Sequence, residues 1–226
     1  MISLLLRQGG AALRMLLAAT VVLGLVYPLA VWGVSRLPGL HGPAEGSVLA
    51  GDSGSSLIGI DPVPADPASE DPEEPGSARG APAEFLSTLS DPYFHTRPSA
   101  SAEDVLGPGD PSTSGGSNQG GFSEKLLGQV EQRRAAIAAR EGVAPEAVPA
   151  DAVTASASGV DPHISPAYAE LQIGRVAGVT GLPAEQVRAL VAGATEGRTL
   201  GFLGEPAVNV TRLNLAVAAA RPGSGG

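Results

Sequence analysis

Three histidines, His41, His95 and His163, are the side chains best suited to acid–base or metal chemistry at neutral pH. His95 follows Asp91 by four residues, and His163 lies two residues after Asp161. A hydrolase triad would also need an activated serine, but the sequence holds no G-x-S-x-G elbow. Neither H-x-x-x-H nor H-E-x-x-H occurs, so the spacing of a histidine metal site is missing too. We therefore predict hydrogen-bonded structural roles for the histidines, with no catalytic residue and no metal ligand.

The run SGGSNQGG at residues 114–121 is the most conspicuous loop in the sequence. Successive amides in such a loop can form a nest for an anion, and Ser123 begins a predicted helix just beyond it. The run lacks the pattern G-x-x-x-x-G-K-[ST], because Lys125 does not stand at the required place. The alternative is a flexible turn whose glycines let the backbone approach a partner closely.

Composition excludes several classes of function. The 226 residues include no cysteine, so a disulfide scaffold, a thiol nucleophile and a cysteine-ligated zinc site are ruled out. The formal net charge is −9, and nucleic acid is not an expected partner, because binding its phosphates requires a surface rich in Lys and Arg. Only 4% of the residues are aromatic, while 31 are Gly and 20 are Pro, so part of the chain is expected to be linker rather than core.

One segment is long and apolar enough to cross a membrane. Residues 15–34, MLLAATVVLGLVYPLAVWGV, contain no charge, and about 20 apolar residues span a bilayer. Arg7, Arg14 and the amino terminus precede the segment, whereas Arg36 alone follows it closely, so residues 1–14 are expected in the cytoplasm and residues 37–226 outside it. The rival interpretation is a cleaved signal peptide, but the run is long for one and VSRLPGL offers no convincing small-residue cleavage site.

The predicted membrane helix carries two features that bear on packing. Thr20 and Gly24 form a small-xxx-small pair that could let a neighbouring helix approach closely. Pro28 is expected to kink the helix, because it cannot donate a backbone hydrogen bond. Tyr27 and Trp32 lie in the later half, where their rings suit the outer membrane interface.

A Pro-rich acidic segment interrupts the rest of the chain. Residues 61–84 hold seven acidic residues, six prolines and one basic residue, Arg79. Low apolarity and charge of one sign cannot support a packed core, so residues 61–89 are predicted to be a disordered, solvated insertion. A cation trap is the alternative, although Pro-broken carboxylates rarely provide the six to eight oxygens on a shaped loop that Ca²⁺ requires.

The remaining segments predict a small α+β domain. Residues 46–60 suggest one or two short strands, and residues 207–210 suggest another after a turn at residues 204–206. A helix is expected from the N-cap Ser123 to about residue 140, with Gly142 as its stop and an apolar side formed by Leu126, Leu127, Val130 and Ile137. Further helices are predicted to begin at Ser165-Pro166 and near Pro183, and to cover residues 212–220.

Six ordered blocks of sequence resemble one family, the small C subunit (KdpC) of the Kdp potassium-transporting P-type ATPase. These blocks are LVYPL at 25–29, GSSLIG at 54–59, YFHTRPSA at 93–100, SGGSNQG at 114–120, VPADAVTASASGVDPHISPAYAELQIGRVA at 148–177 and TLGFLGEPAVNVTRLNLAV at 199–217. LVYPL is similar to the membrane anchor of that family, and GSSLIG to a strand after it. The insertion at 61–89 has no counterpart there, and GGFSEKL follows SGGSNQG where the family usually has another Asn-containing segment.

The resemblance implies a non-catalytic subunit of a membrane complex that couples ATP hydrolysis to potassium uptake. Its partners would be a channel-like potassium-binding subunit, a P-type ATPase subunit that carries the ATP site, and membrane lipid. It would anchor beside the channel-like subunit, stabilise assembly and raise the nucleotide affinity of the ATPase. ATP and potassium would act at the level of the complex, and no cofactor is expected on this chain itself. The alternative is a free-standing, membrane-tethered module that binds an extracytoplasmic ligand.

The motif residues are the candidates for partner contact. Aromatic residues and arginine dominate interface hot spots, so Tyr93, Phe94 and Arg97 stand first, although the two aromatic residues could equally fill a small core. The full candidate set adds Pro98, Ser99, Ser114, Gly115, Gly116, Ser117, Asn118, Thr154, Ser156, Ser158, Gly159, Asp161, Ser165, Pro166, Gln172, Arg175, Val176, Asn209 and Asn214, with Thr20, Gly24, Tyr27 and Pro28 in the membrane helix.

Overall fold

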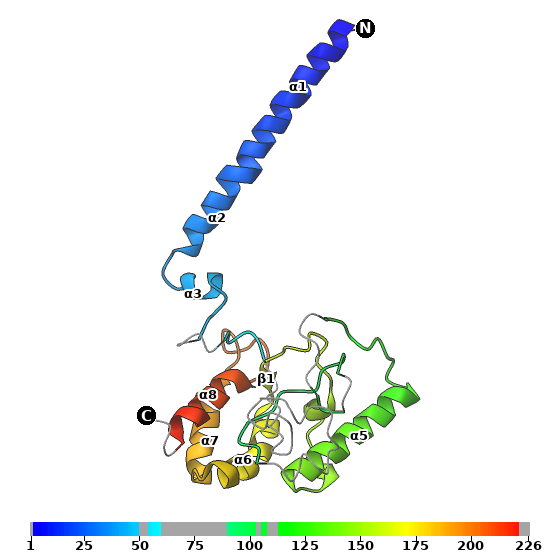
Figure 1. Cartoon of the computed structure of the whole chain (residues 1–226), viewed down its shortest axis with the longest axis vertical. Helices are drawn as coiled ribbons and strands as arrows, with labels where there is room; N and C mark the ends of the chain where they lie inside the picture. The colour runs from blue at the N-terminus through cyan, green and yellow to red at the C-terminus, as the bar shows by residue number, and fades with distance from the viewer. Residues whose placement is uncertain (1, 50–53, 60–89, 103–104, 108–112, 222–226) are drawn as a thin grey trace, which may run out of the picture. The chain divides into compact units, whose positions relative to one another are not determined.

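The computed structural model describes residues 2–49, 54–59, 90–102, 105–107 and 113–221. The chain divides into two compact units, Met1–Ser55 and Ser56–Gly226. The predicted insertion at 61–89 lies outside the described residues. Figure 1 shows the elements of both units.

The first unit is built on one long helix. α1 (Ile2–Val21), the π-helical turn η1 (Val22–Val26) and α2 (Tyr27–Ser35) follow one another without a break, and Figure 1 shows one continuing ribbon. Within it, Leu6–Ser35 is long and apolar enough to cross a membrane and includes the predicted span at 15–34. Its 30 residues extend about 45 Å, more than a bilayer core of about 30 Å requires.

The π turn lies where the sequence predicts a kink at Pro28. Pro28 has no N–H to donate to the carbonyl of Gly24, and its ring would collide with that carbonyl in a regular α-helix. The Tyr27 N–H instead reaches back five residues to the carbonyl of Val22. One extra residue in the turn therefore accommodates the proline without ending the helix.

Between the long helix and residue 49, the first unit has little regular structure. α3 (His41–Ala44) is a single short turn, and Arg36 pairs with Glu45 at 2.8 Å while its guanidinium lies 5.1 Å from the centre of the Trp32 ring. The expectation of one or two strands in 46–60 is wrong for the described residues, where Val48 and Ser55 form only an isolated antiparallel bridge. A single bridge is left because the run is rich in Gly and Ser, which weaken strand pairing.

The described residues of the second unit form four α-helices and a three-stranded antiparallel sheet. The helices are α5 (Glu124–Glu141), α6 (Pro166–Thr180), α7 (Ala184–Gly193) and α8 (Val210–Ala220), and the short 3₁₀ turns η3 (Pro145–Ala147) and η4 (Asp151–Val153) follow α5. The strands β1 (His163–Ile164), β2 (Thr195–Glu196) and β3 (Ala207–Asn209) are ordered β1-β3-β2. Ile164 and Thr195 both pair with Val208, so β3 is the central strand. This confirms the predicted fold class, one apolar N-terminal helix followed by a mixed α and β domain.

Local capping explains the ends of the helices. The Ser123 and Ser165 hydroxyls accept from the amides of Leu126 and Tyr168, and Gly142 ends α5 in the left-handed region at φ 66°. α8 begins two residues before the predicted helix, because the Asn209 side chain caps it by accepting from the Arg212 amide at 3.1 Å.

The core lies between the helices and the sheet. α6 packs against α7, α5 packs against α6, and β3 contacts both α6 and α8. Leu127 lies on the exposed side of α5, contrary to the predicted apolar face, whereas Ile137 is fully buried as predicted. The largest fully buried apolar side chains are Tyr168, Phe94, Ile137, Leu213, Val176, Val187, Val208 and Val210.

Candidate functional site

Several of the sequence motifs meet along one stretch of chain, residues 154–161. The Ser156 amide donates to the Pro98 carbonyl at 2.8 Å, and the Ser156 carbonyl accepts from the Ala100 amide at 2.9 Å. The Ala157 carbonyl accepts from the Gly115 amide at 2.9 Å. These hydrogen bonds join three motifs that are far apart in the sequence, and we call residues 93–101, 114–118 and 154–161 together the motif cluster.

The GSSLIG motif is attached to the same stretch. The Gly59 amide donates to the Val160 carbonyl at 2.7 Å, and a Cβ added at Gly59 would lie 2.5 Å from the Asp161 carbonyl oxygen. Only glycine permits this approach, since real Cβ atoms essentially never come so close. On its other side the motif is held by Asn209, whose side-chain amide donates to the Ser56 carbonyl at 2.7 Å.

Arg97 and Asp161 form the charged contact of the cluster. One guanidinium nitrogen of Arg97 lies 2.5 Å from an Asp161 carboxylate oxygen, and another donates to the Thr154 carbonyl at 3.2 Å. Partial burial would raise the pKa of Asp161, but hydrogen bonds from Arg97 and the His163 amide, with the charge of Arg97, outweigh it and lower that pKa. Arg97 thus links two loops as an ion pair and offers only part of its side chain to a partner.

The serines of the cluster shape its turns. The Ser99 hydroxyl accepts from the Ser101 amide at 3.1 Å, and the Ser156 hydroxyl accepts from the Gly159 amide at 3.2 Å. The Ser158 hydroxyl accepts from the Val160 amide at 3.3 Å. Such hydroxyl-to-amide bonds hold turns in place, so the serines fix the backbone rather than act as nucleophiles.

The 93–95 backbone is held by two side-chain amides from other elements. Asn214 of α8 accepts from the Phe94 amide at 2.7 Å and donates to its carbonyl at 2.9 Å. Gln172 of α6 accepts from the His95 amide at 2.8 Å and donates to its carbonyl at 3.2 Å. Gln172 and Asn214 therefore take the place of a neighbouring strand, and they position the segment from inside the unit.

A buried ionic network lies beside this segment. The Asp91 carboxylate is 2.5 Å from His95 Nε2 and 3.0 Å from Arg175 Nη1. Arg175 also reaches Glu141 at 3.0 Å, and Glu141 pairs with Arg140 at 2.7 Å. The acids are nearly completely buried, so the network lies inside the unit and is not placed to meet a substrate, and loss of one partner would leave a buried charge unpaired.

The network lowers the pKa values of both acids. Burial on its own would raise the pKa of Asp91, but His95 and Arg175 outweigh it and hold that pKa far below its ordinary value. Burial alone would also raise the pKa of Glu141, but Arg140 and Arg175 outweigh it and lower that pKa below its ordinary value. Both groups are therefore carboxylates in the folded unit at neutral pH.

The structure separates the two aromatic candidates. Phe94 is 0% exposed and belongs to the core, which is the alternative that the sequence left open, whereas Tyr93 is 37% exposed. Consecutive residues of an extended segment point to opposite sides, which explains the difference. Val176 is likewise in the core, and Pro166 and Ser165 serve the start of α6.

The loop at 114–118 is the most accessible part of the motif cluster. Ser114, Gly115, Gly116, Ser117 and Asn118 are all exposed, and Asn118 adopts a left-handed φ of 52°. Because the Gly115 amide is bonded to Ala157, this amide is not available to an anion. The geometry therefore favours a turn presented to a partner over an anion nest.

Sequence reasoning missed the roles of Asp91, Glu141 and Arg140. Glu141 and Asp91 meet Arg175 across 34 and 84 residues of chain, and Arg140 pairs with its neighbour Glu141. The spacing of four residues between Asp91 and His95 is the one local signal of the network. Among the described residues no group of three or more His, Asp or Glu side chains could hold a metal ion.

Comparison with known proteins gives a consistent result over nearly the whole chain. Residues 10–219 match the family model described as "K+-transporting ATPase, c chain". A protein of Kineococcus radiotolerans named potassium-transporting ATPase KdpC subunit is 47% identical over 221 residues, 96% of each chain. Proteins of the same name are 45% identical in Streptomyces coelicolor, over 95% of this chain and 94% of the relative, and 38% identical in Koribacter versatilis, over 92% of each.

Proposed function

The chain belongs to the KdpC family, the c chain of K+-transporting ATPases, and from this premise we propose that it is the non-catalytic subunit on which assembly and stability of an ATP-driven potassium uptake complex depend. As a KdpC subunit it is an accessory subunit of a potassium-transport complex. ATP hydrolysis belongs to a P-type ATPase subunit and potassium entry to a channel-like subunit. The apolar span Leu6–Ser35 supports attachment to the membrane in which such partners lie.

The proposed orientation has residues 1–14 in the cytoplasm and the second unit outside it, in a bacterial plasma membrane. It is supported by Arg7, Arg14 and the amino terminus on one side of the span, against Arg36 on the other. A reporter that is active only outside the cytoplasm, fused after Arg221, is expected to be active. Activity of a cytoplasm-only reporter at the same position would contradict this orientation.

The motif cluster is the proposed docking surface, and its assembly from distant motifs is the observation that carries the proposal. Arg97, the serines and the two side-chain amides fix its backbone from within. Fixed loops lose little conformational entropy on binding, which favours recognition by a partner protein. Tyr93, the loop 114–118, Thr154 and Ser158 remain exposed and are the proposed contacts with the channel-like subunit.

Capture of the complex from membranes tests the proposal. A strain lacking this chain should lose high-affinity potassium uptake, and the tagged full chain should restore it and capture both partner subunits. Ser117→Arg places bulk and charge on the exposed loop and should reduce capture, whereas Ala189→Arg on the exposed side of α7 is the matched control and should not.

Two other results would redirect the proposal. Equal capture with both variants would place the docking surface elsewhere on the chain. Normal uptake without the chain, with no captured ATPase, would favour a free-standing, membrane-tethered module that binds an extracytoplasmic ligand.

We further propose that the chain raises the nucleotide affinity of the ATPase subunit through the partner subunits. ATP is cytoplasmic and the second unit is proposed to lie outside, so the effect would be a coupling free energy of about 1–3 kcal/mol. Nucleotide binding to the purified complex with and without this chain should therefore differ by about 5- to 150-fold. Equal affinity in the two preparations would leave the chain with the assembly role alone.

A further inference from the structure

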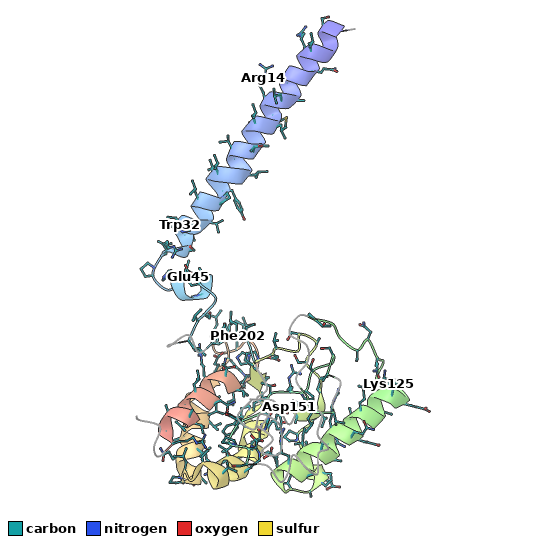
Figure 2. All side chains as sticks on the ribbon, viewed as in Figure 1. Arg14, Trp32, Glu45, Lys125, Asp151 and Phe202 are labelled. Carbon is teal, nitrogen blue, oxygen red and sulfur yellow. The ribbon has the colours of Figure 1, made fainter. Side chains whose placement is uncertain are left out.

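An exposed apolar turn between β2 and β3 is not used by the motif cluster. In Thr199–Leu203, which we call the apolar turn, Leu200 is 79% exposed, Phe202 69% and Leu203 51%. Figure 2 shows Phe202 at the edge of the second unit, far across it from Lys125 at the beginning of α5. Three large apolar side chains that face water within four residues are costly unless something covers them.

The backbone of the apolar turn bonds within itself. Thr199 and Leu203 exchange two hydrogen bonds, each 2.9 Å long. The Gly201 amide donates to the Arg198 carbonyl at 3.0 Å, and the Phe202 amide donates to the Thr199 carbonyl at 3.3 Å. These bonds pair four of the five amides of the turn, and paired amides enter a poorly hydrated environment at lower cost than unpaired ones.

The charges that flank the apolar turn are also paired. Arg198 binds Glu205 at 2.7 Å across the base of the turn, and Arg212 binds Glu196 at 3.1 Å at the neighbouring strand. Each of these two pairs is neutral as a whole. An apolar tip above a neutral polar base matches the gradient from acyl chains to headgroups at a membrane surface.

Local conformation does not account for a leucine at this position. Leu200 has a φ of 55°, in the left-handed region that costs a leucine about 1 kcal/mol or more and favours Gly or Asn. Packing does not account for it either, since the side chain is mostly exposed. An apolar environment outside the unit would explain why an apolar residue stands at this strained position and why its side chain is exposed.

The chain itself keeps a membrane within reach of this turn. The apolar span ends at Ser35 and the second unit begins at Ser56, so 20 residues join them. A fully extended linker of that length covers about 70 Å at most, so the unit stays near the bilayer surface at a high effective concentration. Leu57 and Ile58 are exposed where the chain enters the unit, and Thr211, two residues after β3, donates to the Ile58 carbonyl at 2.9 Å.

From these observations we propose that the apolar turn inserts Leu200, Phe202 and Leu203 into the lipid interface of the membrane that holds the N-terminal helix. The contact gives the second unit a second attachment to the bilayer besides its linker. It does not depend on the partner subunits, so it can hold or fail independently of the proposed role in potassium uptake.

Tryptophan fluorescence of the full chain in lipid vesicles tests this proposal without any partner subunit. Trp32 is the only tryptophan, so a Trp32→Phe background carries a single probe when Phe202→Trp is added. We expect the emission of this probe to shift to shorter wavelength in vesicles and to be quenched by lipids with brominated acyl chains. Phe122→Trp in the same background is the matched control, because Phe122 is 98% exposed and directly precedes Ser123, the N-cap of α5.

Each outcome decides for or against lipid contact. A shifted and quenched probe at 202 with an unshifted probe at 122 supports it, and adding Leu200→Asn should then reduce the quenching at 202. The proposal is overturned if neither probe is quenched, or if both are quenched alike, since tryptophan itself prefers interfaces. A shift at 202 that appears only with partner subunits, and that brominated lipid does not quench, would also overturn it and identify a protein contact instead.

Discussion

Arg175 shows how a residue chosen for partner contact can serve the interior instead. Its guanidinium binds the carboxylate of Asp91 and the carbonyls of Asp91 and Tyr93. It also reaches Glu141 at 3.0 Å and Gln172 at 3.1 Å. One planar group with five donors thus joins α5, α6 and the chain at residues 91–93, where the motif cluster begins. Its position is explained by these bonds without reference to a partner.

Removal of Arg175 is therefore expected to destabilise the second unit strongly. Arg175→Ala leaves Asp91 and Glu141 buried with one cation fewer, and breaking such a pair costs about 3–5 kcal/mol. Arg175→Lys keeps the charge but loses the planar, multiply donating guanidinium, so an intermediate loss of unfolding free energy is expected. Urea unfolding of the full chain in detergent measures both, with Arg188→Ala, which removes only solvent-exposed ion pairs, as control. A loss for Arg175→Ala no larger than the control would contradict this role.

Acid should weaken the fold through the same network. The folded pKa values of Asp91 and Glu141 lie below their ordinary values of 3.8 and 4.5, so these carboxylates stabilise the fold above those values. The contribution is lost as pH falls toward the folded pKa values, by at most about 1.4 kcal/mol per pH unit for each group. Unfolding free energy should thus be nearly constant from about pH 7 to 5 and decline below about pH 4.

The control for the acid prediction is Asp91→Asn. This variant should be less stable at neutral pH, because it loses a charged partner of His95 and Arg175. Its decline in stability below pH 4 should be shallower, since one titrating carboxylate is gone. Unchanged stability of the native chain down to pH 3 would show that these pairs add no stability.

At the scale of elements, what the sequence predicted well is what depends on neighbours in the chain. Ser123, Gly142 and Ser165 mark helix ends because a cap needs only residues three or four positions away. β1 and β2 were not predicted, because each has two residues and exists only through pairing with β3. The paired residues are 44 or 46 positions apart for β1 with β3 and 11 or 13 positions apart for β2 with β3, and no local pattern encodes such pairing.

The Asn209 side chain caps α8 and also bonds to the distant GSSLIG motif. Replacing Asn209 should show how much each of these contacts contributes to stability. Its oxygen caps α8 and its nitrogen donates to the Ser56 carbonyl, with the residue 1% exposed. Asn209→Ala should cost about 2–4 kcal/mol, the sum of a lost cap and an unpaired buried carbonyl. Asn209→Ser keeps the cap and should recover about 1 kcal/mol of that loss.

Ser165→Ala is the matched control for Asn209, because Ser165 caps α6 and should cost only about 1 kcal/mol. Urea unfolding gives the free energies, and hydrogen exchange at the Gly59 amide, which bonds to Val160, reports whether the GSSLIG motif is released. Faster exchange is expected for Asn209→Ala and Asn209→Ser but not for Ser165→Ala. Equal losses of stability for Asn209→Ala and Ser165→Ala would mean that the contact with Ser56 contributes nothing.

At the scale of the whole molecule, the order of the motifs was enough to identify the family, but only the structure shows which motifs contact one another. The sequence indicated Tyr93, Arg97, Gly115 and Asp161 as members of separate motifs, without showing that 93–101 and 114–118 both bond to 154–161. Long-range hydrogen bonds decide this arrangement, and they leave no periodic signal. The same reason explains why sequence alone could not choose between core and interface for Phe94.

Charge is the whole-molecule property that is most unevenly distributed along the chain. Residues 61–84 carry seven acids against Arg79, a charge of −6, so the rest of the chain holds only −3 of the total −9. On either side of this segment the chain is fixed to the second unit, at Gly59 by Val160 and at Asp91 by Arg175. The segment can therefore be exchanged without moving either attachment, provided that its length is kept.

Replacing residues 61–84 with a neutral Gly/Ser segment of equal length is expected to leave the fold and the complex intact. The unfolding free energy should change by less than about 0.5 kcal/mol, because a Pro-rich segment with charge of one sign is not expected to contribute to a packed core. Capture of the partner subunits and potassium uptake should also be unchanged, since the proposed docking surface is the motif cluster. Loss of capture would assign the acidic segment a role in assembly. Reduced uptake with normal capture, restored by raising external potassium, would instead indicate that its carboxylates concentrate cations near the complex, an effect that added salt should screen.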